Sequence, residues 1–189
     1  DPSVIDLVIV GNILSAGQGM NIARQIGVKL GVPVERTAFT INMMCASGLW
    51  SIILAAQAIK TGEASVVLCG GTESMSNAPY LLERARQGYK FGDGAAIDSI
   101  LCDGLVDSFD LQHMGITAER LAKEYNISRI EQDTFAEVSQ RRYAEAASAG
   151  HFDAEIIAMN ELDSDEHPRP DTTMDHLASL KPVFDEKGR

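Results

Sequence analysis

Cys45 occupies the position in this sequence that best suits cysteine chemistry. The run Arg36–Gly71 predicts a strand over Thr37–Asn42, a sharp turn, a helix, and a second strand over Ser65–Cys69, with Cys45 at the turn. A thiol at this point faces the positive end of the helix dipole, which favours the nucleophilic thiolate form. The small residues Ala46–Gly48 leave room for a substrate. The alternative is an inert core thiol, because free cysteine is among the most buried residue types.

Further elements around this turn predict a βαβαβ pattern. Val4–Val10 is an apolar run typical of a strand, and Asn21–Leu30 predicts a helix that ends at Gly31. Gly62 ends the helix that follows Cys45. Alternation of strands and helices favours an α/β fold with a layered parallel sheet. The predicted helices carry apolar faces made of Ile22, Ile26 and Leu30 in the first, and of Leu49, Ile52, Ile53, Ala56 and Ile59 in the second.

The second part of the chain is richer in charge and helix signals. Leu81–Gly94 reads as a long ordered loop or an oligomer contact, and Ile97–Leu105 and Thr117–Tyr125 read as helices. Ser128 and Glu131 form a capping box that opens a helix to about Ala149. The inward positions predicted for this helix are Ile130, Phe135 and Val138. Beyond it, we expect a strand over Glu155–Met159 and an acidic loop over Glu161–Asp175.

Composition excludes several classes of function. The 189 residues are 45% hydrophobic with a net charge of −11, which suits a folded domain and argues against a nucleic-acid or membrane-surface protein. No apolar run approaches the roughly 20 residues of a membrane span, and no signal peptide is recognisable. The three cysteines are widely spaced and odd in number, which indicates reduced thiols in the cytoplasm. The absence of CxxC and HExxH motifs argues against a metal site.

Five segments carry motifs in a characteristic order: Asn42–Leu49, Gly70–Ser76, His113–Glu119, Glu131–Asp133 and Leu180–Phe184. Together they resemble the thiolase family over essentially all 189 residues. The resemblance is closest to the acetyl-CoA acetyltransferases, because of the His-Met-Gly segment. It implies a thiolase-like layered fold with an incomplete N-terminal sheet: a core domain over residues 1–76 and an inserted, mostly helical loop domain over 77–189.

The resemblance also implies an activity. Thiolases of this kind condense two acetyl-CoA reversibly into acetoacetyl-CoA and coenzyme A, with Cys45 as the acyl-carrying nucleophile. Coenzyme A thioesters are then the substrates, and no permanently bound cofactor or metal is expected. A loop from about Leu82 to Ile100 resembles the segment through which such enzymes form tetramers, so a homo-oligomer is expected. The implied coenzyme A and acyl contacts are Leu105, His113, Met114, Gln140 and Arg169.

Other interpretations of these residues stay open. His113 could be an ordinary loop histidine, Gln140 a surface amide and Arg169 a solvated charge. The family's remaining catalytic segments, which carry an asparagine, a histidine and a second cysteine, are not in this sequence, so we expect weak or no turnover by this chain alone. The competing hypotheses are a non-catalytic module that binds coenzyme A or a partner subunit, and a 3-ketoacyl-CoA thiolase of fatty-acid degradation.

Overall fold

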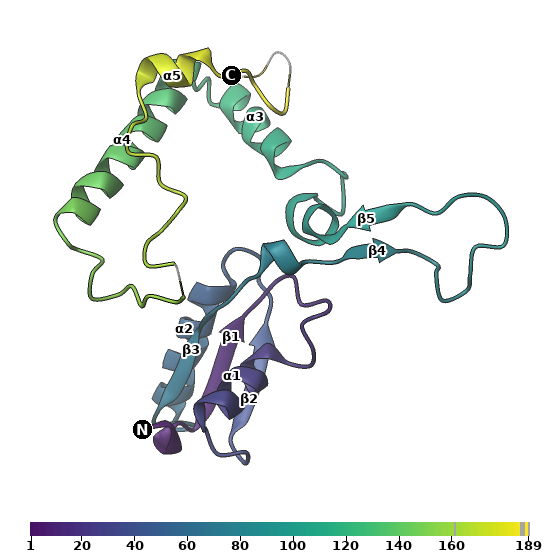
Figure 1. Ribbon diagram of the computed structural model, residues 1–189, viewed down its shortest axis with the longest axis vertical. Helices are drawn as coiled ribbons and strands as arrows, with labels where there is room; N and C mark the ends of the chain where they lie inside the picture. Colours follow the sequence, from purple (N-terminus) through teal and green to yellow (C-terminus); the bar gives the residue numbers. More distant parts are fainter. Residues whose placement is uncertain (161, 186–187, 189) are drawn as a thin grey trace. The chain divides into compact units, whose positions relative to one another are not determined.

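The computed structural model describes residues 1–160, 162–185 and 188, and divides into two compact units, Asp1–His113 and Met114–Arg189 (Figure 1). By its internal contacts, the segment 77–113 belongs to the first unit. The predicted division into a core domain over 1–76 and a loop domain over 77–189 concerns the layout of the family, and it stays a prediction.

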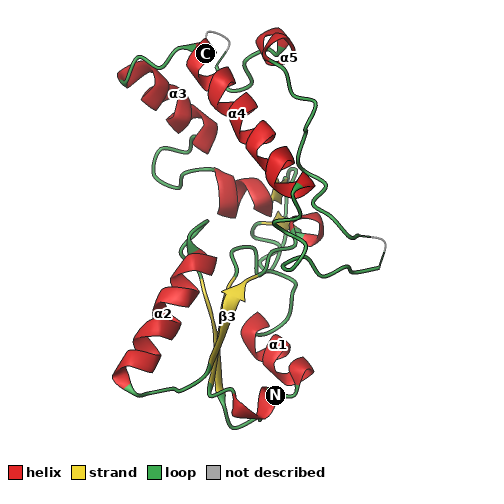
Figure 2. Ribbon diagram, turned by 90° about the vertical axis from the view of Figure 1, so that its left-hand side faces the viewer, coloured by secondary structure: helices red, strands yellow, loops and turns green. Residues whose placement is uncertain are grey.

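A three-stranded parallel sheet forms the centre of the first unit, in the order β2-β1-β3. Helix α1 packs on β1 and β2, and α2 packs on β3 and β1 from the opposite face (Figure 2). The predicted α/β class and its parallel crossovers are therefore confirmed. The elements are β1 (Leu7–Gly11), α1 (Ile22–Leu30), β2 (Thr37–Ile41), α2 (Ser47–Thr61) and β3 (Val67–Gly71).

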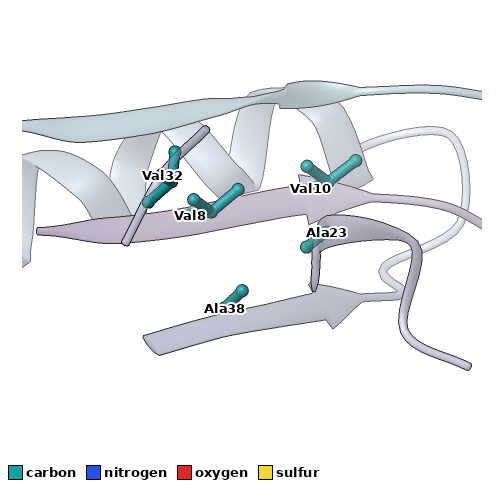
Figure 3. Packing of buried hydrophobic residues seen from close by; sticks show 5 residues of the cluster. All are labelled: Val8, Val10, Ala23, Val32 and Ala38. Carbon is teal, nitrogen blue, oxygen red and sulfur yellow. The ribbon is translucent and has the colours of Figure 1, made fainter. Parts of the chain in front are cut away.

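The hydrophobic core lies between α1 and the sheet. Its buried cluster consists of Val8, Val10, Ala23, Val32 and Ala38 (Figure 3). Val8 and Val10 share one face of β1 because side chains alternate along a strand. Ile22 and Ile26 pack against this cluster, as predicted, whereas the third residue of the predicted face, Leu30, is 50% exposed.

Asp6 ties the beginnings of the three strands together. Its Oδ2 accepts hydrogen bonds from the backbone N–H groups of Ser65 (2.9 Å) and Val66 (3.2 Å), and Arg36 Nη1 lies 3.1 Å from Oδ1. The two backbone donors, helped by the Arg36 charge, lower the pKa of the Asp6 carboxyl. Strand β1 begins at Leu7, directly after Asp6. The sequence predicted a start at Val4, which instead ends the short 3-10 helix η1 (Pro2–Val4).

Helix α2 packs on the sheet through its small residues. Ser51 is fully buried, and its hydroxyl donates to a backbone carbonyl, with the Gly48 oxygen at 2.6 Å and the Gly70 oxygen at 2.9 Å. The predicted buried stripe was wrong for the described chain, since Leu49 is 63% and Ile52 52% exposed. A helix that is apolar nearly all round does not reveal from periodicity which side meets the sheet. The buried positions are Ser47, Ser51, Ala55 and Ala58.

The segment Met44–Thr61, which contains α2, has a mean hydropathy of 1.2 over 18 residues. By length and composition alone it could cross a membrane, which departs from the expectation that no apolar run approaches a span. Core helices of soluble proteins have the same length and composition.

A β-hairpin follows the sheet in the first unit. Strands β4 (Tyr80–Leu82) and β5 (Ala96–Asp98) pair antiparallel, and residues 83–95 connect them. Phe91, in this connection, is fully exposed. The hairpin occupies the predicted long loop. The helix predicted over Ile97–Leu105 is confirmed over residues 99–105, which include the π-helix η3 (Leu101–Leu105), whereas its first two residues belong to β5.

The second unit consists of α3 (Met114–Glu124), α4 (Arg129–Ser148) and α5 (Met174–Ser179). The predicted capping box of α4 is confirmed: the Ser128 hydroxyl accepts from Glu131 N at 3.3 Å, and Glu131 Oε2 accepts from Ser128 N at 2.7 Å. The bonds from Ser128 lower the pKa of the Glu131 carboxyl.

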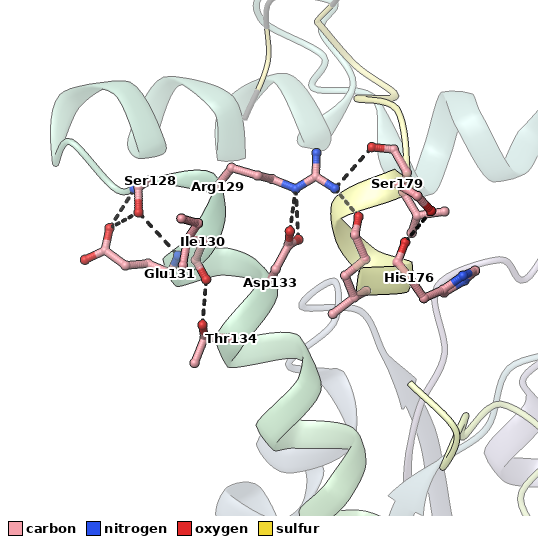
Figure 4. Close-up of polar contacts among 10 residues, drawn as sticks. Ser128, Arg129, Ile130, Glu131, Asp133, Thr134, His176 and Ser179 are labelled. Carbon is pink, nitrogen blue, oxygen red and sulfur yellow. Dashed lines mark hydrogen bonds and ion pairs between the residues drawn. The ribbon is translucent and has the colours of Figure 1, made fainter. Parts of the chain in front are cut away.

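Arg129 joins the first turn of α4 to α5. Its Nε donates to Asp133 at 2.9 Å, and its Nη2 donates to the backbone oxygens of Leu177 and, at 3.1 Å, Leu180 (Figure 4). Asp133 is consequently the buried residue of α4, at 8% exposed.

Two predictions for the second unit were wrong, and a third was confirmed. The predicted inward residues Ile130 and Phe135 are 71% and 77% exposed in the described chain. The strand predicted over Glu155–Met159 is absent from the described residues, where Met159 makes one isolated bridge to Leu162. The acidic loop predicted over Glu161–Asp175 is confirmed over residues 162–173, and α5 begins at Met174; the first residue of the predicted loop lies outside the described residues.

Candidate active site

Cys45 lies in a sharp turn between β2 and α2, as predicted, and its residue is exposed. The turn depends on Met44, whose φ of 51° places a non-glycine residue in the left-handed region. Such a conformation is strained and persists only where neighbouring contacts hold it. Those contacts include Met44 N donating to Asn42 Oδ1 at 2.9 Å and the Ser47 hydroxyl donating to the Met44 carbonyl at 2.6 Å.

Glycines allow this turn to sit directly on the ends of two strands. A Cβ added to Gly11, the last residue of β1, would lie 2.5 Å from the Ser47 carbonyl carbon and 2.7 Å from Gly48 N. A Cβ on Gly71, the last residue of β3, would lie 3.2 Å from Gly48 Cα. The backbones therefore approach closer than any side chain permits, which fixes the height of Cys45 above the sheet.

Glu73 lines the same site as Cys45. Its Oε1 accepts from Asn12 Nδ2 and Leu14 N, both at 3.0 Å, and its Oε2 accepts from Ile13 N at 2.9 Å. Asn12 Nδ2 also donates to the Thr72 carbonyl at 2.9 Å. One carboxylate thus links the loop after β1 to the loop after β3.

The turn at Cys45, the loop after β1 and the loop after β3 line a cleft of about 350 Å³. All of it lies in the first unit, at the carboxyl end of the parallel sheet, where α/β folds commonly bind ligands. An exposed thiol at a helix N-terminus in such a cleft can attack an electrophilic carbonyl. The lining residues are Gly11, Asn12, Ile13, Met44, Cys45, Ser47, Gly48, Gly71, Thr72 and Glu73.

The other predicted site residues divide between the two units. Leu105 ends the turn η3, and His113 pairs with Val106 in an isolated bridge, both in the first unit. Neither lines the Cys45 cleft. Met114 begins α3 in the second unit, where its side chain is 53% exposed.

The structure brings Gln140 and Arg169 together in the second unit. Gln140 Oε1 accepts a hydrogen bond from the backbone N–H of Arg169 at 2.8 Å, across 29 residues of chain. The same loop is held on α4 by Tyr143, whose hydroxyl donates to Asp165 Oδ2 at 3.2 Å and whose ring stacks on Phe152. Gln140 therefore supports the loop that carries Arg169.

Asn12 is the residue of this site that the sequence analysis did not single out. Gly11-Asn12 directly follows a buried strand, and the carboxyl ends of parallel strands meet at one edge of the sheet. The position of Asn12 directly after a strand could therefore have identified it as a candidate site residue. Its partnership with Glu73, 61 residues away, is not visible in local sequence.

The remaining cysteines differ from Cys45 in their surroundings. Cys69 lies on β3 and is half-buried. Cys102 is exposed, and its thiol donates to the Asp103 carboxylate at 3.0 Å. This bond and the nearby carboxylate charge raise the pKa of the Cys102 thiol, which disfavours its thiolate. Among the described residues, no group of histidine, cysteine and carboxylate side chains could hold a metal ion.

Comparison with known proteins gives consistent matches over the whole chain. A "Probable acetyl-CoA acyltransferase" of Staphylococcus epidermidis is 47% identical over an alignment of 197 residues, which covers 100% of this chain and 50% of that protein. The protein of the same description in Staphylococcus aureus is 46% identical with the same coverage. The chain therefore spans about half the length of the curated relatives it matches.

Solved structures agree with this fold. The Bacillus anthracis acetyl-CoA acetyltransferase superimposes with a TM-score of 0.91 at 36% identity, over 100% of this chain and 50% of that one. The Ascaris suum Acat5 thiolase in complex with coenzyme A gives 0.92 at 38% identity, over 100% and 49%. Residues 1–189 also match the family described as "Thiolase, N-terminal domain". The chain thus belongs to the thiolase family and has the fold of its N-terminal domain.

Proposed function

We propose that this chain provides the nucleophile of a thiolase that condenses two acetyl-CoA into acetoacetyl-CoA and coenzyme A, and catalyses the reverse. The observation that carries the proposal is Cys45 itself, exposed in a cleft, on a strained turn at the start of α2. Membership of a family of acyltransferases supports a carbonyl, rather than a metal or a disulfide, as the target of this thiol.

In the proposed reaction, Cys45 Sγ forms a bond to the thioester carbonyl carbon. The bond from that carbon to the coenzyme A sulfur breaks, and the departing thiolate takes up a proton. A second acetyl-CoA then gives a proton from its methyl carbon to a base supplied by further segments of the enzyme, and that carbon forms a bond to the acetyl carbonyl carbon. The bond from the acetyl carbon to Cys45 Sγ breaks, which releases acetoacetyl-CoA and restores the Cys45 thiolate. The start of α2 and the glycine-lined strand ends hold the sulfur in place while the acyl group changes carrier.

Contacts to coenzyme A are proposed for Leu105, His113, Met114, Gln140 and Arg169. The name of the Ascaris suum neighbour, a thiolase solved in complex with coenzyme A, supports acyl-CoA as the substrate class. The hydrogen bond between Gln140 and Arg169 N supports a preformed loop, on which the Arg169 guanidinium can meet a phosphate or stack on a base.

We also propose that the protein forms a homo-oligomer in the cytoplasm. The exposed hairpin β4–β5, which contains the predicted tetramer segment from about Leu82 to Ile100, is proposed as a contact between copies in a homo-oligomer. The net charge of −11 and three unpaired thiols favour the reducing, aqueous cytoplasm.

A chimera tests the activity. Residues 1–189 replace the matching half of the Staphylococcus epidermidis relative, and thiolysis of 3-ketoacyl-CoA is measured from four to twelve carbons, with the unaltered relative as control. We expect the chimera to cleave acetoacetyl-CoA and to lose rate as the chain lengthens. A constant rate across these lengths would instead support a degradative 3-ketoacyl-CoA thiolase. The 189-residue chain alone is expected to show little or no turnover, whereas a full rate from it would contradict the need for further segments.

A further inference from the structure

Glu73 is an exposed residue that nevertheless makes three hydrogen bonds within the protein. Both of its carboxylate oxygens accept hydrogen bonds, and all three donors come from Asn12, Ile13 and Leu14. Two of these donors are backbone N–H groups in a loop that directly follows β1. Bonds to an ionised acceptor are stronger than neutral ones, so this carboxylate fixes the loop.

The loop that Glu73 fixes is a wall of the Cys45 cleft. Asn12 and Ile13 line the cleft together with Thr72, Glu73 and Cys45. Leu14, the third residue of the loop, is 6% exposed, and its Cδ2 lies 3.8 Å from a Cβ built on Gly104 in η3. A movement of Glu73 would therefore shift the cleft wall.

One polar atom of the Asn12 side chain makes no hydrogen bond to the described residues. The side chain is 3% exposed, and its Nδ2 is used by Thr72 and Glu73. Its Oδ1 is buried and has no hydrogen-bond partner among the described residues. Buried polar atoms are nearly always paired with protein, water or a ligand, so an unpaired acceptor on a residue that lines a cleft offers a binding position to a donor from outside this chain.

We propose that Asn12 is a substrate-binding residue for the acyl thioester: Oδ1 accepts a hydrogen bond from an amide N–H on the arm of the thioester, and Glu73 is the positioning residue that holds Asn12 for this contact. The inference rests on the proposed function, because it assumes that the cleft holds an acyl thioester. The ligand class follows from the atom, since a carbonyl oxygen recognises an N–H or O–H donor.

Two small acetyl donors test this with the full 189-residue chain. S-acetyl-N-acetylcysteamine carries an amide N–H on its arm, and ethyl thioacetate carries none. The rate of acetylation of Cys45 is measured by mass spectrometry for the unaltered chain, for Asn12→Leu and for Glu73→Gln. Glu63→Gln is the matched control, an identical chemical change at an exposed glutamate that does not line the cleft.

Asn12→Leu and Glu73→Gln are expected to slow acetylation by the amide-bearing donor about tenfold, the value of one hydrogen bond, and to leave the rate with ethyl thioacetate within about twofold. Glu63→Gln is expected to change neither rate. An equal loss with both donors would show a structural role only and overturn the inference, as would no loss at all. Failure of the unaltered chain to acetylate Cys45 with either donor would overturn the proposed function itself.

Discussion

Serine at position 45 is expected to abolish thiolysis by the chimera, with a loss of roughly a thousandfold or more, because an alcohol replaces the nucleophile that carries the acyl group. Activity on acetoacetyl-CoA measures the effect. Cys102→Ser is the matched control, since Cys102 is also exposed but does not line the cleft. It is expected to keep the parental rate within about twofold, because surface substitutions rarely perturb a fold. Comparable losses in the two variants would contradict the role given to Cys45.

Alanine at position 11 is expected to destabilise the first unit by about 3 kcal/mol, within the range for overpacking. The new Cβ would lie 2.5 Å from the Ser47 carbonyl carbon and 2.7 Å from Gly48 N, and backbone atoms have no rotamer by which to move away. The turn at Cys45 must therefore shift, so alkylation of Cys45 changes as well. The free energy of unfolding, from urea titration of the 189-residue chain, measures the effect.

Gly70→Ala controls for the glycine change itself. A Cβ on Gly70 meets nothing within 4 Å, although Gly70 lies beside Gly71 in the same sheet. We expect this variant to stay within about 0.5 kcal/mol of the parent, the usual range for substitutions away from packed contacts. Equal stability of Gly11→Ala and Gly70→Ala would show that the close approach of the β1 end to α2 is not needed.

The sequence predicts the α/β class because its signals are local. Strand runs, glycine C-caps and the Ser128–Glu131 capping box each depend on residues within a few positions, and the structure contains them. The position of Cys45 was predictable for the same reason, since a strand, a turn and a helix follow one another around it.

Burial was predicted less well because it depends on partners distant in sequence. The large apolar residues of α2, such as Leu49 and Ile52, are exposed, while its serine and alanine side meets the sheet. In α4, Asp133 is buried because Arg129 pairs with it and reaches the carbonyls of α5, about 50 residues further on. Periodicity identifies an apolar face but not the element that covers it.

The cleft also combines a feature with a local sequence signal and a feature that depends on distant residues. Cys45 could be found from local pattern, whereas the wall made by Asn12, Ile13 and Glu73 depends on hydrogen bonds across some 60 residues. Glu73 entered the sequence analysis only as a letter in a family motif. Its three hydrogen bonds give that letter a physical reason: it joins the ends of β1 and β3.

The central claim is that Cys45 carries the acyl group, and locating that group tests it most directly. The 189-residue chain is incubated with acetyl-CoA, digested at acidic pH, and the acetylated cysteine is identified by mass spectrometry. Cys102 is the internal control, because it is exposed like Cys45 while Asp103 raises the pKa of its thiol. The account predicts acetyl thioester on Cys45 and little on Cys69 or Cys102, and prior alkylation of Cys45 should prevent it. Equal acetylation of the three thiols, or acetylation of Cys102 first, would contradict it.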